Sequence, residues 1–331
     1  MKQTNFFLHI SKIILFSGIL VATASARAEL KVVTTIKPLH SLISNVMDGV
    51  GEPGLIIDGS ISPHSFTMKP SHAKMLEEAD VIFWIGEGIE TSMEEPLDSI
   101  AKDAEVIEFM ELDSIAKLKF REESILGDHD DHDDHDDHDD HDDHDDHDDH
   151  DDHDDHAGHE GHNHGEFDAH IWLDPSNAKE MVHEIAHELG DLDPANKDKY
   201  EANAEATIKA LDQLISDVGT DINSDAKFVV FHDAYQYFEE RFGVRAAGAL
   251  TLNTDVLPGA KQIADIQDVI KDKGIKCIFS EPQFNPKIIT TIAEDMNIKT
   301  GVFDPLGANI DPGKSLYFKL ISNLGNELKG C

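Results

Sequence analysis

Lys31-Val-Val-Thr-Thr-Ile36 leads directly into Lys37-Pro-Leu-His-Ser-Leu-Ile-Ser-Asn-Val-Met47, and the residue pattern changes between the two segments. The first segment is rich in β-branched residues, which favour strands. From Pro38 onward the apolar residues recur every three or four positions, which predicts a helix that begins at this proline. These residues are Leu39, Leu42, Ile43, Val46 and Met47. A strand followed at once by a helix indicates an α/β fold.

The same alternation continues on both sides of residues 128–164. Before that segment, strands are predicted at 55–57, 81–85 and 105–109, and helices at 71–79 and near 93–101. Beyond it, strands are predicted at 227–231, 244–250, 276–280 and 299–303, with helices that end at Arg241 or begin at Gly259, Pro286 and Gly313. Strands that alternate with helices predict parallel sheets covered by helices on both faces.

Two helical segments separate these two sets of strands. A helix at 176–190 leads through Asp193-Pro194 into a second helical stretch at 195–221, which contains no glycine before Gly219 and suggests a connecting strut. We therefore predict an α/β fold of two lobes, each a mainly parallel sheet flanked by helices, joined by one long rigid helix. The predicted boundaries are a signal peptide at 1–28, an N-terminal lobe at 29–193, the connecting helix at 194–222 and a C-terminal lobe at 223–331.

The first 28 residues have the pattern of a secretory signal peptide. Lys2 and Lys12 precede an apolar run at 13–22, and Ala26-Arg27-Ala28 has the small residues of a cleavage site. The run is too short to span a bilayer, and no cysteine follows the cleavage point to carry a lipid. We expect the mature protein to begin near Glu29 and to be exported to a bacterial periplasm.

The chain is strongly acidic, with 27 Lys and Arg against 67 Asp and Glu and a formal net charge of -40. Roughly half of this excess belongs to one segment, since 19 aspartates lie between Asp128 and Asp155. Such a chain is a poor partner for nucleic acid or an anionic membrane and attracts cations.

Residues 128–164 contain thirteen of the 21 histidines, and from His129 to His156 the sequence repeats His-Asp-Asp without a break. We call this segment the His/Asp tract. Its one apolar residue is Ala157, so we expect a disordered loop. Neutral imidazole is a preferred ligand of zinc, nickel and copper, which predicts a flexible metal collector. The alternative is an inert acidic spacer.

The chain has two cysteines, Cys277 and Cys331. In an oxidising compartment, the simplest interpretation is a disulfide between them. Zinc capture by the two thiols is the alternative, but two isolated cysteines make an incomplete metal site.

Three histidines outside the tract and one aspartate follow predicted strands or stand in loops. These are His64 in Ser-Pro-His-Ser-Phe, His170 in Asp-Ala-His-Ile-Trp, His232 after Phe-Val-Val-Phe, and Asp304 after Gly-Val-Phe. Ligands of open parallel sheets bind beyond the carboxyl ends of the strands. We therefore expect these four side chains in a shared cleft between the lobes.

Several motifs resemble the metal-specific substrate-binding proteins of ABC importers, and they resemble the zinc type (ZnuA-like) most closely. They are Ser62-Pro-His-Ser-Phe66 with Lys69-Pro-Ser71, Asp168-Ala-His-Ile-Trp-Leu-Asp-Pro175, Phe231-His-Asp-Ala-Tyr235, Ser280-Glu-Pro-Gln283 and Asp304-Pro-Leu-Gly307. The resemblance covers nearly the whole mature chain, and a histidine-rich loop at this place is typical of the zinc members. It implies two α/β lobes on a rigid helix and delivery of the ion to an inner-membrane permease driven by a cytoplasmic ATPase. We expect a monomer.

The resemblance further implies that His64, His170 and His232 are three imidazole ligands of a transported Zn²⁺ and that Asp304 is the carboxylate at the fourth place. Three nitrogens and one oxygen suit tetrahedral zinc, whereas an oxygen-richer set suits manganese. Some zinc relatives have a glutamate immediately before the first histidine, but this chain has Pro63 there. The fourth ligand is accordingly Asp304 or a water, with Glu281 a weaker candidate. A binding protein for another divalent metal, such as manganese, is an alternative.

A secreted zinc metallopeptidase is the rival prediction, because His183-Glu-Ile-Ala-His187 matches the H-E-x-x-H motif. Both histidines fall on the polar face of the predicted helix, and the regular α/β alternation around it favours the binding protein. We expect no enzymatic activity. His40 and His72, each near the start of a helix, are predicted to be surface or capping residues.

Overall fold

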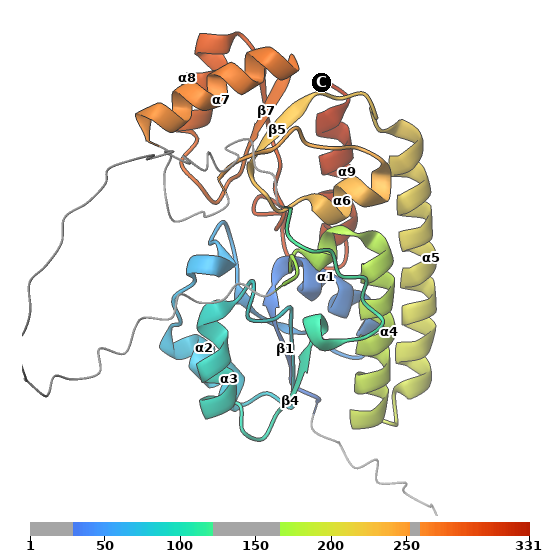
Figure 1. The fold of residues 1–331 in the computed structure, drawn as a ribbon. Helices are drawn as coiled ribbons and strands as arrows, with labels where there is room; N and C mark the ends of the chain where they lie inside the picture. Colours follow the sequence, from blue (N-terminus) through green and yellow to red (C-terminus); the bar gives the residue numbers. More distant parts are fainter. Residues whose placement is uncertain (1–28, 122–165, 252–258) are drawn as a thin grey trace, which may run out of the picture.

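A computed structural model describes residues 29–121, 166–251 and 259–331. The predicted signal peptide and the His/Asp tract lie outside the described residues (Figure 1). No described helix has the length and apolar character that a membrane span requires.

The first sheet has four parallel strands in the order β2-β1-β3-β4. The β-branched run forms the inner strand β1, and all five of its residues are buried, as expected for a strand covered on both faces. The strands are β1 (Val32–Ile36), β2 (Gly54–Ile57), β3 (Val81–Trp84) and β4 (Glu105–Glu108). The helices of this part are α1 (Lys37–Val46), α2 (Pro70–Glu77) and α3 (Glu94–Ile100), with short 3₁₀ helices η1 (Pro63–Ser65), η2 (Thr91–Met93) and η3 (Phe109–Glu111).

The second sheet repeats this topology in the order β6-β5-β7-β8, again with parallel strands. Its strands are β5 (Phe228–His232), β6 (Ala249–Thr251), β7 (Cys277–Ser280) and β8 (Lys299–Val302). Its helices are α6 (Gln236–Phe242), α7 (Ala260–Lys273) and α8 (Lys287–Met296). The predicted strand at 244–250 is much shorter, because Gly248 has a φ of 154° and the ladder begins only at Ala249.

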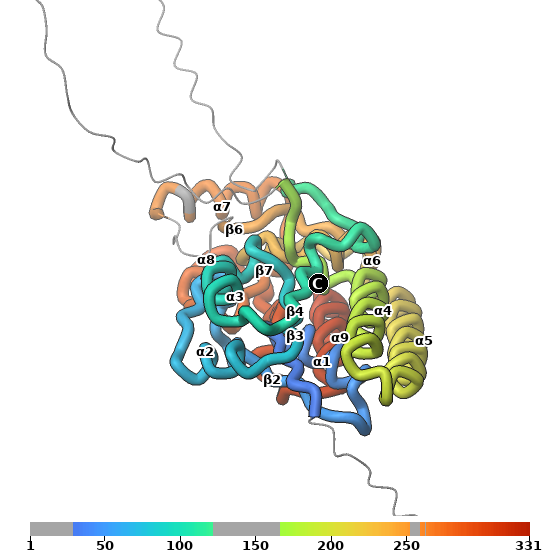
Figure 2. The backbone as a smooth tube through the Cα atoms, turned by 90° about the horizontal axis from the view of Figure 1, so that it is seen from below, coloured from blue at the N-terminus to red at the C-terminus, as the bar shows by residue number. Residues whose placement is uncertain are grey.

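Two long helices lie between the two sheets in the sequence. The helices α4 (Pro175–Leu192) and α5 (Lys197–Asp221) lie side by side in both views (Figures 1 and 2), so the predicted strut is accompanied by a second helix along its first half. The last helix, α9 (Leu316–Leu328), packs on α1 and α5. The predicted fold class, two parallel-sheet α/β lobes with flanking helices, is confirmed.

The lobes share one hydrophobic core. A single cluster of buried side chains extends from Ile36 of the first sheet through Leu211 of α5 to Phe279 of the second sheet, and a smaller one lies under α7 and α8. Cys277 and Cys331 form the predicted disulfide, which fixes the end of the chain to β7.

Candidate metal centre

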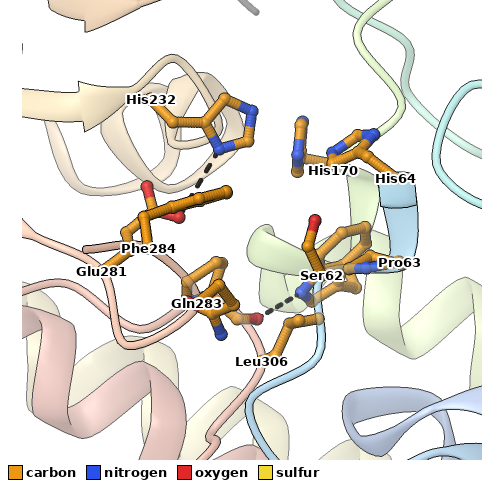
Figure 3. A pocket seen from close by; sticks show the side chains of 11 residues that line it. Ser62, Pro63, His64, His170, His232, Glu281, Gln283, Phe284 and Leu306 are labelled. Carbon is orange, nitrogen blue, oxygen red and sulfur yellow. Dashed lines mark hydrogen bonds and ion pairs between the residues drawn. The ribbon is translucent and has the colours of Figure 1, made fainter. Parts of the chain in front are cut away.

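His64, His170 and His232 meet in space although they are far apart in the sequence. Each offers a ring nitrogen, and these three atoms all lie within 4.8 Å of one another. Among the described residues, they form the one group of three or more histidine, cysteine or acidic side chains that are close enough to hold an ion. Figure 3 shows the three rings together at one end of a pocket.

Three different local structures present these rings. His64 lies in the 3₁₀ helix η1, which Pro63 begins shortly after β2 ends. His170 directly precedes the 3₁₀ helix η4 (Ile171–Leu173), and His232 is the last residue of β5. His64 and His232 therefore lie at or beyond the carboxyl ends of parallel strands, as expected from the sequence, whereas His170 lies in a loop.

His170 has a carboxylate behind it. Its Nδ1 lies 2.7 Å from Oδ1 of Asp168, and both residues are buried. The other carboxylate oxygen accepts a hydrogen bond of 3.1 Å from Gln236. This arrangement makes Nδ1 the proton-bearing nitrogen and leaves Nε2 for a metal.

His232 also faces a carboxylate. Its Nδ1 lies 3.6 Å from Oε2 of Glu281, a distance too long for a hydrogen bond but short enough for an ion pair. Burial acts to lower the pKa of His232, but the carboxylates of Glu281, Asp168 and Asp233 together outweigh burial, so the pKa is raised above 6.5. Among the described residues, neither His232 Nδ1 nor Glu281 Oε1 has a hydrogen-bond partner.

Asp304 is not part of the cluster of three histidines. It follows β8 as predicted, but its carboxylate accepts hydrogen bonds from Gln283 Nε2 and from the backbone N–H groups of Leu306, Gly307 and Ala308. The Asp-Pro-Leu-Gly sequence thus forms a turn around its own carboxylate. The pocket is instead lined by Ser62, Pro63, His64, His170, Trp172, His232, Glu281, Gln283, Phe284, Pro305 and Leu306.

The H-E-x-x-H histidines lie elsewhere. His183 and His187 are exposed on α4, whose buried face is formed by other residues. His187 contacts Glu188 at 3.2 Å, and this contact raises the pKa of its imidazole. His72 accepts a hydrogen bond from the backbone N–H of Lys69 and so caps α2, as predicted.

Neither Asp168 nor Gln283 was expected at this site from the sequence. Asp168 had a recognisable signal, since a carboxylate two residues before a ligand histidine can reach the ring of that histidine. Gln283 donates to Asp304 and its Oε1 is buried without a partner among the described residues. Its place beside the pocket depends on the turn after β7, which no sequence pattern indicates.

The sequence model of one protein family, described as "ZnuA: Zinc-uptake complex component A periplasmic", matches residues 32–331. The chain is 50% identical over 303 residues to the high-affinity zinc uptake system protein ZnuA of Brucella abortus (strain 2308), an alignment that covers 91% of each chain. It is 39% identical over 326 residues to the protein of the same name from Paracoccus denitrificans (strain Pd 1222), covering 97% of this chain and 98% of that one. A solved structure titled "Crystal structure of ZnuA" matches with a TM-score of 0.69 at 22% identity, covering 90% of this chain and 98% of the other, which shows the shared fold.

Proposed function

The chain belongs to the ZnuA family of periplasmic zinc-uptake components, and we propose that His64, His170 and His232 are the protein ligands of the zinc that it carries. A member of this family is the substrate-binding component of an ABC importer. It binds Zn²⁺ and passes it to a membrane permease that a cytoplasmic ATPase drives.

The convergence of three ring nitrogens is the observation that carries this assignment. Tetrahedral zinc with bonds of ~2.0–2.1 Å holds its ligand nitrogens about 3.3 Å apart, so the site needs only a small contraction to close. A set of three neutral nitrogens favours zinc over manganese, which prefers oxygen ligands. Asp168 and the carboxylate of Glu281 supply negative charge behind the rings.

We assign the fourth place to a water molecule. Glu281 lies on the Nδ1 side of His232, so it supports the ring from behind when Nε2 binds the ion. Asp304 already accepts four hydrogen bonds, and binding zinc would require it to leave them. The unpartnered Oε1 of Gln283 borders the pocket and offers an acceptor for a bound water.

The remaining parts of the chain fit this role. Residues 1–28 direct export and are cleaved, and the mature protein works as a periplasmic monomer. The His/Asp tract binds several divalent ions weakly and raises their concentration near the cleft, because its aspartates attract cations and its histidines offer many interchangeable ligands.

Peptidase activity is not part of this function. The exposed histidines of α4 lack a third ligand among the described residues, and zinc peptidases need their metal in a substrate cleft.

Growth under zinc limitation tests the transport role. A bacterium whose gene for this chain is deleted should fail to grow in chelated medium, and added zinc or the wild-type chain should restore growth. Restoration by a chain that carries His64→Ala, His170→Ala and His232→Ala together would contradict the proposal.

A further inference from the structure

We propose that His170 and His232 form a fixed pair held by the second lobe, and that His64 is the movable ligand which closes on the ion. This inference rests on the proposed zinc site. It makes Tyr237 and Arg241 positioning residues for His170, although neither touches the ion.

Residues 168–174 carry His170 and lie before α4 in the sequence, yet α6 of the second lobe holds them. The hydroxyl of Tyr237 donates a hydrogen bond of 2.5 Å to the carbonyl of Asp168, and Gln236 donates to its carboxylate. The same hydroxyl accepts a hydrogen bond of 2.9 Å from the backbone N–H of Leu118. One buried phenol therefore fixes both chain segments on which His170 depends.

Two further contacts lie on the other side of His170. Arg241 donates two hydrogen bonds to the carboxylate of Asp174, at 2.6 and 2.8 Å. Trp172 donates a hydrogen bond of 2.8 Å to the carbonyl of Pro305 in the loop after β8. The backbone N–H of Asp168 also donates a hydrogen bond of 2.8 Å to the carbonyl of Leu118, and a β-carbon placed on Gly88 would lie 3.0 Å from that of Ala169.

Buried charges also hold the lobes together around this pair. Arg121 donates to Asp233 at 3.0 Å and to Glu239 at 2.7 Å, and all three side chains are largely buried. A second contact joins the lobes through Lys37 on α1 of the first lobe. Its ammonium donates to the carbonyls of Gly307, Ala308 and Ile310, which follow β8 of the second lobe. Separating the lobes would leave these charges without their partners, which is costly.

The segment that carries His64 is more exposed than the segments that carry His170 and His232. Residues 58–61 before it are exposed, and Gly59 has a φ of +77° with no atom near the place of a β-carbon. His64 is half-buried, whereas His170 and His232 are buried. The ring centroids of the pair are 4.9 Å apart, but those of His64 lie 5.5 and 5.6 Å from them.

These differences define an order of events. Zinc first binds the two nitrogens of the fixed pair, and His64 then moves inward to complete the site. Release to the permease begins with His64 leaving, so the lobes need not separate.

Hydrogen exchange of the full mature chain, with and without one equivalent of zinc, tests this order. Zinc should slow exchange in residues 58–66 by at least about tenfold and change residues 168–174 by less than about twofold. An equal response in the two segments would overturn the fixed pair. Native mass spectrometry of the same samples reports whether one zinc binds tightly at all, so failure of the proposed function is seen separately.

A variant pair tests the positioning role. Tyr237→Phe should weaken zinc binding by about tenfold and make residues 168–174 respond to zinc, because their contact with α6 is lost. Arg241→Met removes a half-exposed side chain and should act in the same direction. Tyr200→Phe, which removes a hydroxyl between α4 and α5 that contacts Asp193, is the control and should change neither quantity. Unchanged affinity and unchanged exchange in both variants would show that these residues do not position His170.

Discussion

His170 Nδ1 lies 2.7 Å from Asp168 Oδ1, and this contact makes a buried carboxylate part of the candidate metal centre. The carboxylate also accepts from the backbone N–H of His170 and from Gln236. It therefore orients the ring and fixes its tautomer.

Asp168→Asn should lower zinc affinity by about 10–100-fold, because the amide removes the charge and places a donor near other donors. Competition with a chelator of known affinity measures the loss. Asp193→Asn changes another buried aspartate, near the turn between α4 and α5, and should leave affinity within about twofold. Equal losses in both variants would show that the effect is general destabilisation.

Zinc affinity should fall as the pH is lowered, and the fall should begin above pH 6.5. A proton on His232 competes with the ion, and the carboxylate of Glu281 raises the pKa of that ring despite the opposing effect of burial. Removing the carboxylate with Glu281→Gln should lower the pKa of His232 in the zinc-free protein. NMR titration of the His232 ring from pH 8 to 5 in both zinc-free proteins decides this, and an unchanged or raised pKa in the variant would contradict it.

Glu90 should make the folded state less stable as pH rises. Its burial raises the pKa to about 7, only partly opposed by hydrogen bonds from Thr35 and Gly86. Because the pKa of Glu90 is higher in the folded state than in the unfolded state, its contribution to the free energy of unfolding is fully present below pH 4.5 and is lost as the pH rises to about 7. Glu90→Gln mimics the protonated form, so it should match the parent near pH 4.5 and exceed it at pH 8.

The gain at pH 8 should be on the order of 3 kcal/mol. Urea unfolding at the two pH values measures it. Glu95→Gln, an exposed change on α3, is the control and should show no such pH dependence. A constant difference between Glu90→Gln and the parent would contradict the assignment.

Reduction of the Cys277–Cys331 disulfide should destabilise the protein. The bond closes a separation of 54 residues, for which the chain-entropy model gives roughly 4 kcal/mol. Urea unfolding with and without reductant measures the change, and thiol counting on denatured periplasmic protein should find no free thiol. Two free thiols would show that the bond does not form in the cell.

Residue patterns predicted most of this fold because they report local geometry. The run at Lys31 and the periodicity after Pro38 correspond to β1 and α1, and the strand ends place His64 and His232 correctly. The predicted strand at 244–250 was too long, since apolar content does not reveal where a ladder of hydrogen bonds begins. Local patterns therefore predict elements better than their ends.

The sequence did not predict the contacts between segments that are far apart in the chain. No local pattern around Arg121 predicts its ion pairs with Asp233 and Glu239. Lys37 has the sequence context of an exposed helix residue, but its side chain is buried against the loop after β8. Asp304 shows the same limit, because its position after a strand suggested a ligand while its carboxylate is bound by its own turn. Such roles depend on packing that no local pattern records.

We propose that the three-histidine cleft, and not the His/Asp tract, holds the transported ion. Competitive zinc titration of a chain without residues 128–164 tests it most directly, with His232→Ala and His72→Ala in the same background. The parent and the His72 control should each bind one zinc with equal affinity, while His232→Ala should lose most of it, because a site with two protein nitrogens loses its geometry as well as a bond. Undiminished affinity in His232→Ala, or loss of the tight site on deletion of the tract alone, would contradict the account.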